Sequence, residues 1–157
     1  MRDLRVARVG CCLFVVCAAM LGSVASASAS SASIKAAIES YGSKIDVAEG
    51  RVLTAVGEYK TTKNPSGVQS AIGESVAVLS ALRSKVQHQS AAKRRAKRAK
   101  TKIVAGLHAL IVAYQRLDTA YGENVTSPEA AKTEATIALA AVKVGHNELV
   151  EGIKLLS

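Results

Sequence analysis

Cysteine, proline and large aromatic residues are scarce in this 157-residue sequence. Its three cysteines, Cys11, Cys12 and Cys17, all lie in one apolar segment near the N-terminus. A chain that loses this segment contains no disulfide, no thiol nucleophile and no cysteine metal ligand. There is no tryptophan, and the single phenylalanine belongs to the same segment. The four tyrosines fit apolar helical seams, so aromatic platforms for stacking nucleic-acid bases are not expected.

Motifs for catalysis or cofactor binding are also missing. No glycine-rich loop follows a strand pattern, and no serine lies in the strand–turn–helix context of a nucleophile. None of His88, His108 and His146 has a carboxylate three residues earlier, which excludes the ligand spacing of di-iron bundles. A two-histidine metal site from His108 and His146 is an alternative to histidines at the edge of a core. Glu148 and Glu151 are expected to be solvated rather than a paired acid and base. We therefore expect no enzyme activity, cofactor, metal or small-molecule substrate.

The first 29 residues have the plan of a secretory signal peptide. Three arginines precede an apolar run over residues 9–24, which is followed by small residues. Cleavage near Ala27 or Ala29 would divide the chain into a signal peptide, 1–29, and a secreted, extracytoplasmic domain, 30–157. The alternative is an uncleaved membrane anchor, but the apolar run is shorter than the ~20 residues that a transmembrane helix needs.

Apolar residues recur at three- and four-residue steps through the rest of the chain, which is the period of amphipathic helices. The pattern predicts helices at about 34–60, 66–88, 91–122 and 127–156, after a disordered Ser/Ala leader at 28–33. One seam is expected on the third helix, running from Ala92 to Tyr121. The last helix is expected to pack through Ala135, Leu139, Val142, Leu149, Ile153 and Leu156.

Four helices of similar length with short connections favour an all-α fold, an antiparallel up-down four-helix bundle with coiled-coil-like seams. The alternative has one continuous helix from Pro65 to Tyr121, with the outer two helices folded back along it. No glycine or proline in residues 87–92 decides between them. The bundle is preferred because two-helix hairpins alone bury too little apolar surface.

Seven cations within ten residues depart from this ordinary helical pattern. No acidic residue occurs between Glu74 and Asp118. The formal net charge of the chain is +9, and loss of the signal peptide, with three arginines and one aspartate, leaves 18 basic and 11 acidic residues. The seven cations thus account for the whole remaining excess. They form the basic run: Lys93, Arg94, Arg95, Lys97, Arg98, Lys100 and Lys102.

The predicted position of the basic run is electrostatically unfavourable. At the start of a helix, cations meet the positive end of the helix dipole and repel one another at i,i+3 and i,i+4 spacing. Since no acid is near in sequence, we interpret the run as a site for a polyanion: an anionic polymer, the lipid headgroups of a membrane surface, or nucleic acid. The alternatives are a solvated helix start and a dibasic convertase cleavage site at 95–98.

A protein-interaction role is the competing hypothesis. The apolar stretches 103–105 and 110–113 are wider than one seam, so the third helix has apolar surface to share with a partner protein or a second copy. On this view the protein is a helical scaffold and the basic run is incidental. Asn124-Val125-Thr126 is also an N-glycosylation sequon in a predicted loop.

Overall fold

The computed structural model describes residues 29–123 and 127–157. In this part of the chain there are four helices and no strand: α2 (Ala29–Thr62), α3 (Ser66–Gln87), α4 (Arg94–Glu123) and α5 (Pro128–Leu156). The predicted all-α fold is confirmed. The predicted signal peptide lies outside the described residues, except for its final residue, and so does the Asn124 sequon.

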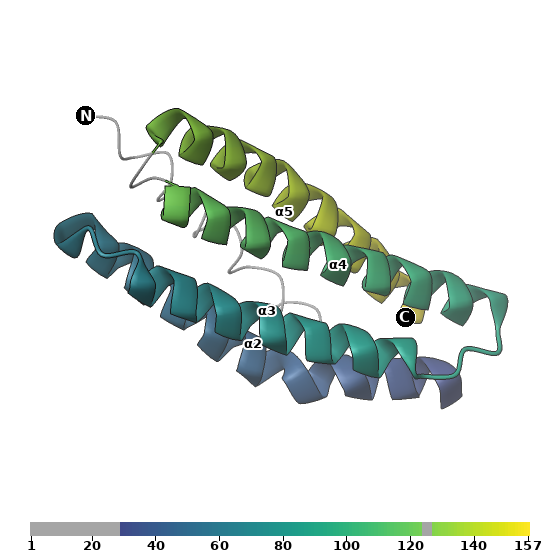
Figure 1. Ribbon diagram of the computed structural model, residues 1–157. Coiled ribbons are helices and arrows are strands. Elements are labelled where there is room, and N and C mark those ends of the chain that lie inside the picture. The colour runs from purple at the N-terminus through teal and green to yellow at the C-terminus, as the bar shows by residue number, and fades with distance from the viewer. Residues whose placement is uncertain (1–28, 124–126) are drawn as a thin grey trace.

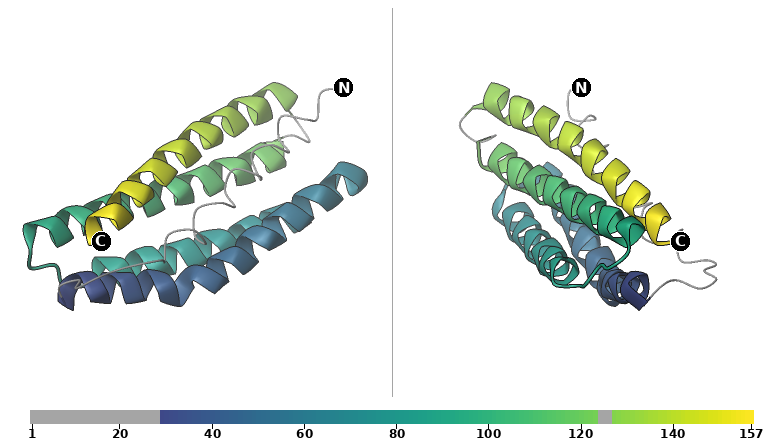
Figure 2. Two further views of the ribbon diagram at one scale, coloured as in Figure 1. Left: turned by 180° about the vertical axis from the view of Figure 1, so that it is seen from behind. Right: turned by 90° about the vertical axis from the view of Figure 1, so that its right-hand side faces the viewer.

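Consecutive helices form two hairpins that pack against each other. Figure 1 shows α2 and α3 side by side below α4 and α5, with each helix running opposite to the one before it. Extensive contacts join α2 to α3, α3 to α4 and α4 to α5, whereas α2 touches α4 and α5 at only a few positions. The two hairpins therefore meet mainly through α3 and α4, as the views from behind and from the side in Figure 2 also show.

The loop between α3 and α4 shows that the two central helices are separate. α3 ends at Gln87, residues 88–93 are not helical, and α4 begins at Arg94. The backbone N–H groups of His88 and Gln89 still bond back into the last turn of α3. The alternative with one helix from Pro65 to Tyr121 is therefore wrong.

One face each of α2, α3 and α4 builds the main core. Its largest fully buried side chains follow the three- and four-residue steps of the predicted seams. At the end of the core formed by the last turns of α2 and α4, the rings of Tyr59 and Tyr121 meet edge to face with centroids 5.1 Å apart, a favourable aromatic geometry. The fully buried side chains are Ile34, Val68, Ile72, Val86, Ile103 and Leu107.

A second buried face of α4 packs against α5 through small residues. A Cβ placed on Gly106 would lie 2.7 Å from the carbonyl oxygen of Gly145, and one on Gly145 would lie 2.9 Å from that of Gly106. Near the start of α4, a Cβ on Gly152 would lie 3.1 Å from the carbonyl oxygen of Ala99. The two backbones thus approach more closely than residues with larger side chains would allow.

These small residues recur every seven positions on both helices. The antiparallel register that pairs Gly106 with Gly145 also places Ala113 opposite Ala138. A seven-residue repeat keeps one seam facing its partner along the whole length of a helix pair. The buried small residues are Ala99, Gly106, Ala113 and Ala120 on α4, and Ala131, Ala138, Gly145 and Gly152 on α5; together they form the small-residue seam.

The structure differs from the sequence prediction in the last helix and in the Ser/Ala tract. Leu139 was expected in the core, but its side chain is 41% exposed, while Ala138 beside it is fully buried. The small-residue seam explains this, because it turns position 138 toward α4 and position 139 outward. The Ser/Ala tract is also not a disordered leader over its described part, since α2 begins at Ala29 and Ser31 is buried.

The close approach of α4 and α5 predicts opposite effects for two similar substitutions. Gly145→Ala would push a methyl group against the Gly106 carbonyl and should lower the free energy of unfolding by roughly 1–3 kcal/mol. The methyl group added by Gly73→Ala on α3 meets no atom within 4 Å. This substitution should raise the free energy of unfolding by up to about 1 kcal/mol, because alanine favours helix. Urea denaturation of both variants measures the difference; equal stabilisation by both would contradict the close packing.

Candidate polyanion-binding surface

The basic run lies at the start of α4, at the end of the molecule where α2 begins and α5 ends (Figure 1). Lys93 is the last residue of the loop, and the other six cations occupy the first turns of the helix. Ala96 and Ala99 are buried, as predicted, but Ala92, where the inner seam was expected to begin, is exposed in the loop before α4. The seven cations do not form one uniform patch, because three of them have partners in neighbouring helices.

Lys100 closes the C-terminal end of α3. Its Nζ donates hydrogen bonds to the carbonyl oxygens of Gln87, at 2.6 Å, and Gln89, at 2.8 Å. The last carbonyls of a helix lack partners within the helix and carry the negative end of its dipole. A half-buried ammonium group therefore satisfies this end and ties the first turns of α4 to α3.

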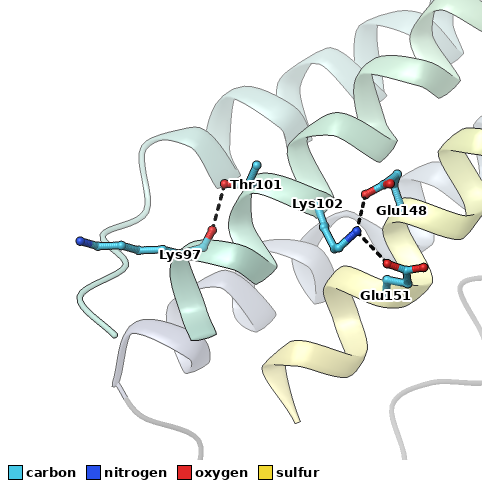
Figure 3. Close-up of polar contacts among 5 residues, drawn as sticks. All are labelled: Lys97, Thr101, Lys102, Glu148 and Glu151. Atoms are coloured by element: carbon cyan, nitrogen blue, oxygen red, sulfur yellow. Dashed lines mark hydrogen bonds and ion pairs between the residues drawn. The ribbon is translucent and has the colours of Figure 1, made fainter. Parts of the chain in front are cut away.

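Arg95 and Lys102 attach the same segment to α5. Lys102 Nζ lies 3.0 Å from a carboxylate oxygen of Glu148 and 2.7 Å from one of Glu151. Figure 3 shows both carboxylates turned toward this ammonium group. Arg95 Nη2 lies 3.4 Å from the carbonyl oxygen of Lys154 in the last turn of α5, at the outer limit of hydrogen bonding.

The Lys102 ion pairs correct two sequence expectations. Glu148 and Glu151 are not simply solvated, and the basic run does have acidic neighbours, brought to it by α5. The hydrogen bonds to Glu151 and Glu148 raise the pKa of Lys102, and the bond from Lys102 lowers the pKa of Glu151. Lys102 is thus held in its charged form by partners that compensate its charge.

The other four cations, Lys93, Arg94, Lys97 and Arg98, form what we call the free basic patch. All four are exposed, and within the described chain no side-chain hydrogen bond or ion pair joins them to another residue. Figure 3 shows the Lys97 side chain extending away from the neighbouring helices, opposite in direction to Lys102. Their mutual repulsion is therefore not relieved inside the molecule.

The helical backbone disfavours proteolytic processing at this segment. Cleavage after the dibasic pair would cut between Arg98 and Ala99, and Ala99 is fully buried within α4. Proteases cut transiently opened, extended segments, so α4 would have to unfold locally first.

Two further features of the described residues concern metal binding and membrane spans. His108 is exposed and His146 is half-buried, and no group of three or more His, Cys, Asp or Glu side chains there is placed to hold a metal ion. Among α2 to α5, none is both long and apolar enough to cross a membrane. In comparisons with known proteins, no family model, curated protein or solved structure matches the chain.

A separate ionisable group lies at the edge of the core, away from the basic run. Glu49 on α2 is half-buried, and its burial, with a smaller contribution from Asp46, raises its pKa to about 7. Tyr114 on α4 and Ser75 on α3 are both buried close by. Burial, and next the charge of Glu49, raises the pKa of Tyr114, while a hydrogen bond with Ser75 lowers it. Ionised Glu49 is therefore unfavourable for the folded state.

If Lys100 is a structural residue, removing its charge should destabilise the fold. Lys100→Gln should lower the free energy of unfolding by about 1 kcal/mol, because the carbonyls of Gln87, at the end of α3, and of Gln89, in the loop, lose an ammonium donor. Lys97→Gln, three residues away and exposed, is the matched control and should change stability by less than about 0.5 kcal/mol. Urea denaturation at low salt would show the contrast; equal effects would contradict this assignment.

Glu49 predicts a pH dependence of stability with a definite sign. The folded-state pKa of Glu49, about 7, exceeds the ordinary value of 4.5. The stability that neutral Glu49 contributes is therefore fully present below pH 4.5 and is lost as the pH rises through 7. Glu49→Gln stays neutral, so its stability relative to wild type should rise by roughly 1–3 kcal/mol between pH 4.5 and pH 8. Glu58→Gln, at an exposed position on the same helix, is the control. A Glu49→Gln difference that does not change with pH would refute the prediction.

Proposed function

We propose that this is a secreted or envelope-associated, non-enzymatic helical protein that binds polyanions through the start of α4. In this proposal an antiparallel up-down four-helix bundle holds the binding surface, and the protein needs no cofactor. The observation that carries it is the free basic patch, four exposed cations without partners in the described chain. A polyanion would relieve their repulsion and release its own counterions on binding.

The packing beneath the patch supports a binding role over a loose charged end. Ala96, Ala99 and Ile103 are buried on the inner side of the same turns. Lys100 and Lys102 fix these turns to α3 and α5. A rigid segment loses little conformational entropy when its side chains meet a ligand, which favours affinity. Secretion is supported by the basic and apolar pattern of residues 1–29.

A helical scaffold or protein-interaction module is the second candidate. The surface expected for it on α4, at 103–105 and 110–113, is mostly taken up within the fold, since Ile103, Leu110 and Ile111 are buried. Ile137 and Val144 lie seven residues apart on one side of α5, and their side chains are 42% and 56% exposed. Exposed apolar residues on one helix face suit a protein partner or a second copy of the chain. Light scattering would then show a dimer that persists in high salt, because apolar contacts are not screened.

The polyanion hypothesis is tested by heparin affinity and by binding to anionic vesicles. Replacing Lys93, Arg94, Lys97 and Arg98 with Gln removes four charges at exposed positions and keeps helix propensity nearly unchanged. The wild type should be retained on heparin at physiological ionic strength, and the variant should elute at clearly lower salt.

The control removes the same number of charges elsewhere. Its four substitutions, at exposed lysines distant in sequence from the basic run, are Lys60→Gln, Lys63→Gln, Lys132→Gln and Lys143→Gln. If this control loses as much retention as the patch variant, binding follows net charge alone. If the wild type passes through at physiological ionic strength, the free basic patch is only a solvated helix start.

A further inference from the structure

The free basic patch is small and has clear limits. Residues 94, 97 and 98 follow the i, i+3, i+4 spacing of one helix face, so these side chains project from neighbouring points on α4. From position 94 to position 98 the helix rises only about 6 Å, and Lys93 directly precedes it. The four cations are therefore concentrated within less than two turns.

Along the same face of α4, the positive charge stops after Arg98. The next positions outward are Thr101 and Ala105, which are exposed and uncharged. The Thr101 hydroxyl donates a hydrogen bond to the Lys97 carbonyl oxygen, 3.0 Å away, and so remains close to its own helix. An anionic chain that continued along α4 would find no further cation over these turns.

The two sides of the patch are also closed to additional anions. On the α5 side, the carboxylates of Glu148 and Glu151 neutralise Lys102 and would repel a negatively charged ligand. On the α3 side, Lys100 is half-buried and its Nζ is occupied by two carbonyl oxygens. With Arg95, whose Nη2 lies 3.4 Å from the carbonyl oxygen of Lys154, three of the seven cations in the basic run have partners within the fold.

We propose that the ligand is a compact group of closely spaced phosphates or sulfates, recognised by Lys93, Arg94, Lys97 and Arg98. This inference rests on the proposed function and narrows its ligand class. Four exposed cations on neighbouring positions suit three to five adjacent anionic groups better than single charges spread over a surface. Free polyphosphate and a multiply phosphorylated lipid headgroup share this chemistry.

The first test uses linear polyphosphates of defined length and protein expressed from the full chain. Affinity per binding site, measured by calorimetry, should rise up to about five phosphate units and change less than threefold at greater lengths. With at most four phosphates neutralised, log affinity for the longest chain should fall against log salt with a slope of about −3 to −4. Changing Arg94, Lys97 and Arg98 to Gln should reduce affinity for the five-unit chain at least tenfold, and changing Lys60, Lys132 and Lys143 to Gln should not.

A second arm distinguishes the sources of the ligand. Vesicles that contain phosphatidylinositol bisphosphate are compared with phosphatidylserine vesicles of equal total charge. Stronger binding to the bisphosphate vesicles supports a clustered headgroup; five-unit polyphosphate binding without vesicle binding supports a soluble ligand. Equal binding to both vesicles, together with weak binding of five-unit polyphosphate, would overturn the compact site.

Failure of this inference differs from failure of the proposed function. A salt slope near −6, or affinity that keeps rising well beyond five units, would show that all seven cations or a longer track take part. The protein would then still bind polyanions, but not through a compact site. Absence of binding to heparin, vesicles and polyphosphate alike would overturn both proposals.

Discussion

The close approach of α4 and α5 is the contact on which the rest of the structure depends. Gly106 and Gly145 bring two backbones together at a distance where one added methyl group would clash. Because the small-residue seam occupies one face of α4, a different face packs against α3 and, at a few positions, against α2. α4 is thus buried on two sides, and its start is held where the ends of α3 and α5 can reach it.

The sequence predicts the packing of those helices whose large apolar residues follow the helical period. Large apolar residues at three- and four-residue steps predicted the core positions of α2 and α3, and Pro65 predicted the break between them. The break between α3 and α4 was expected, because two-helix hairpins alone bury too little apolar surface, but its extent at 88–93 was not predictable, since the sequence there contains neither glycine nor proline. The chain leaves the helix there because packing of the second hairpin against the first requires a turn.

The second face of α4 was missed although its signal is present in the sequence. Small residues at intervals of seven on two consecutive helices predict a close antiparallel pair, but the spacing of the large apolar residues predicted Leu139 in the core instead of Ala138. The division within the basic run could not be predicted in the same way. Lys100 binds backbone carbonyls, and Lys102 binds carboxylates on a helix about 46 residues away, so both contacts depend on register.

The pattern of contacts between consecutive helices has a consequence for how the chain acquires its structure. Nearly every extensive interface joins neighbours in sequence, so few long loops must close before native contacts form. Chains with such low contact order fold quickly, and each hairpin is a natural cooperative unit. Rapid formation of the α4–α5 hairpin would shorten the time during which its alanine- and valine-rich faces are open to aggregation.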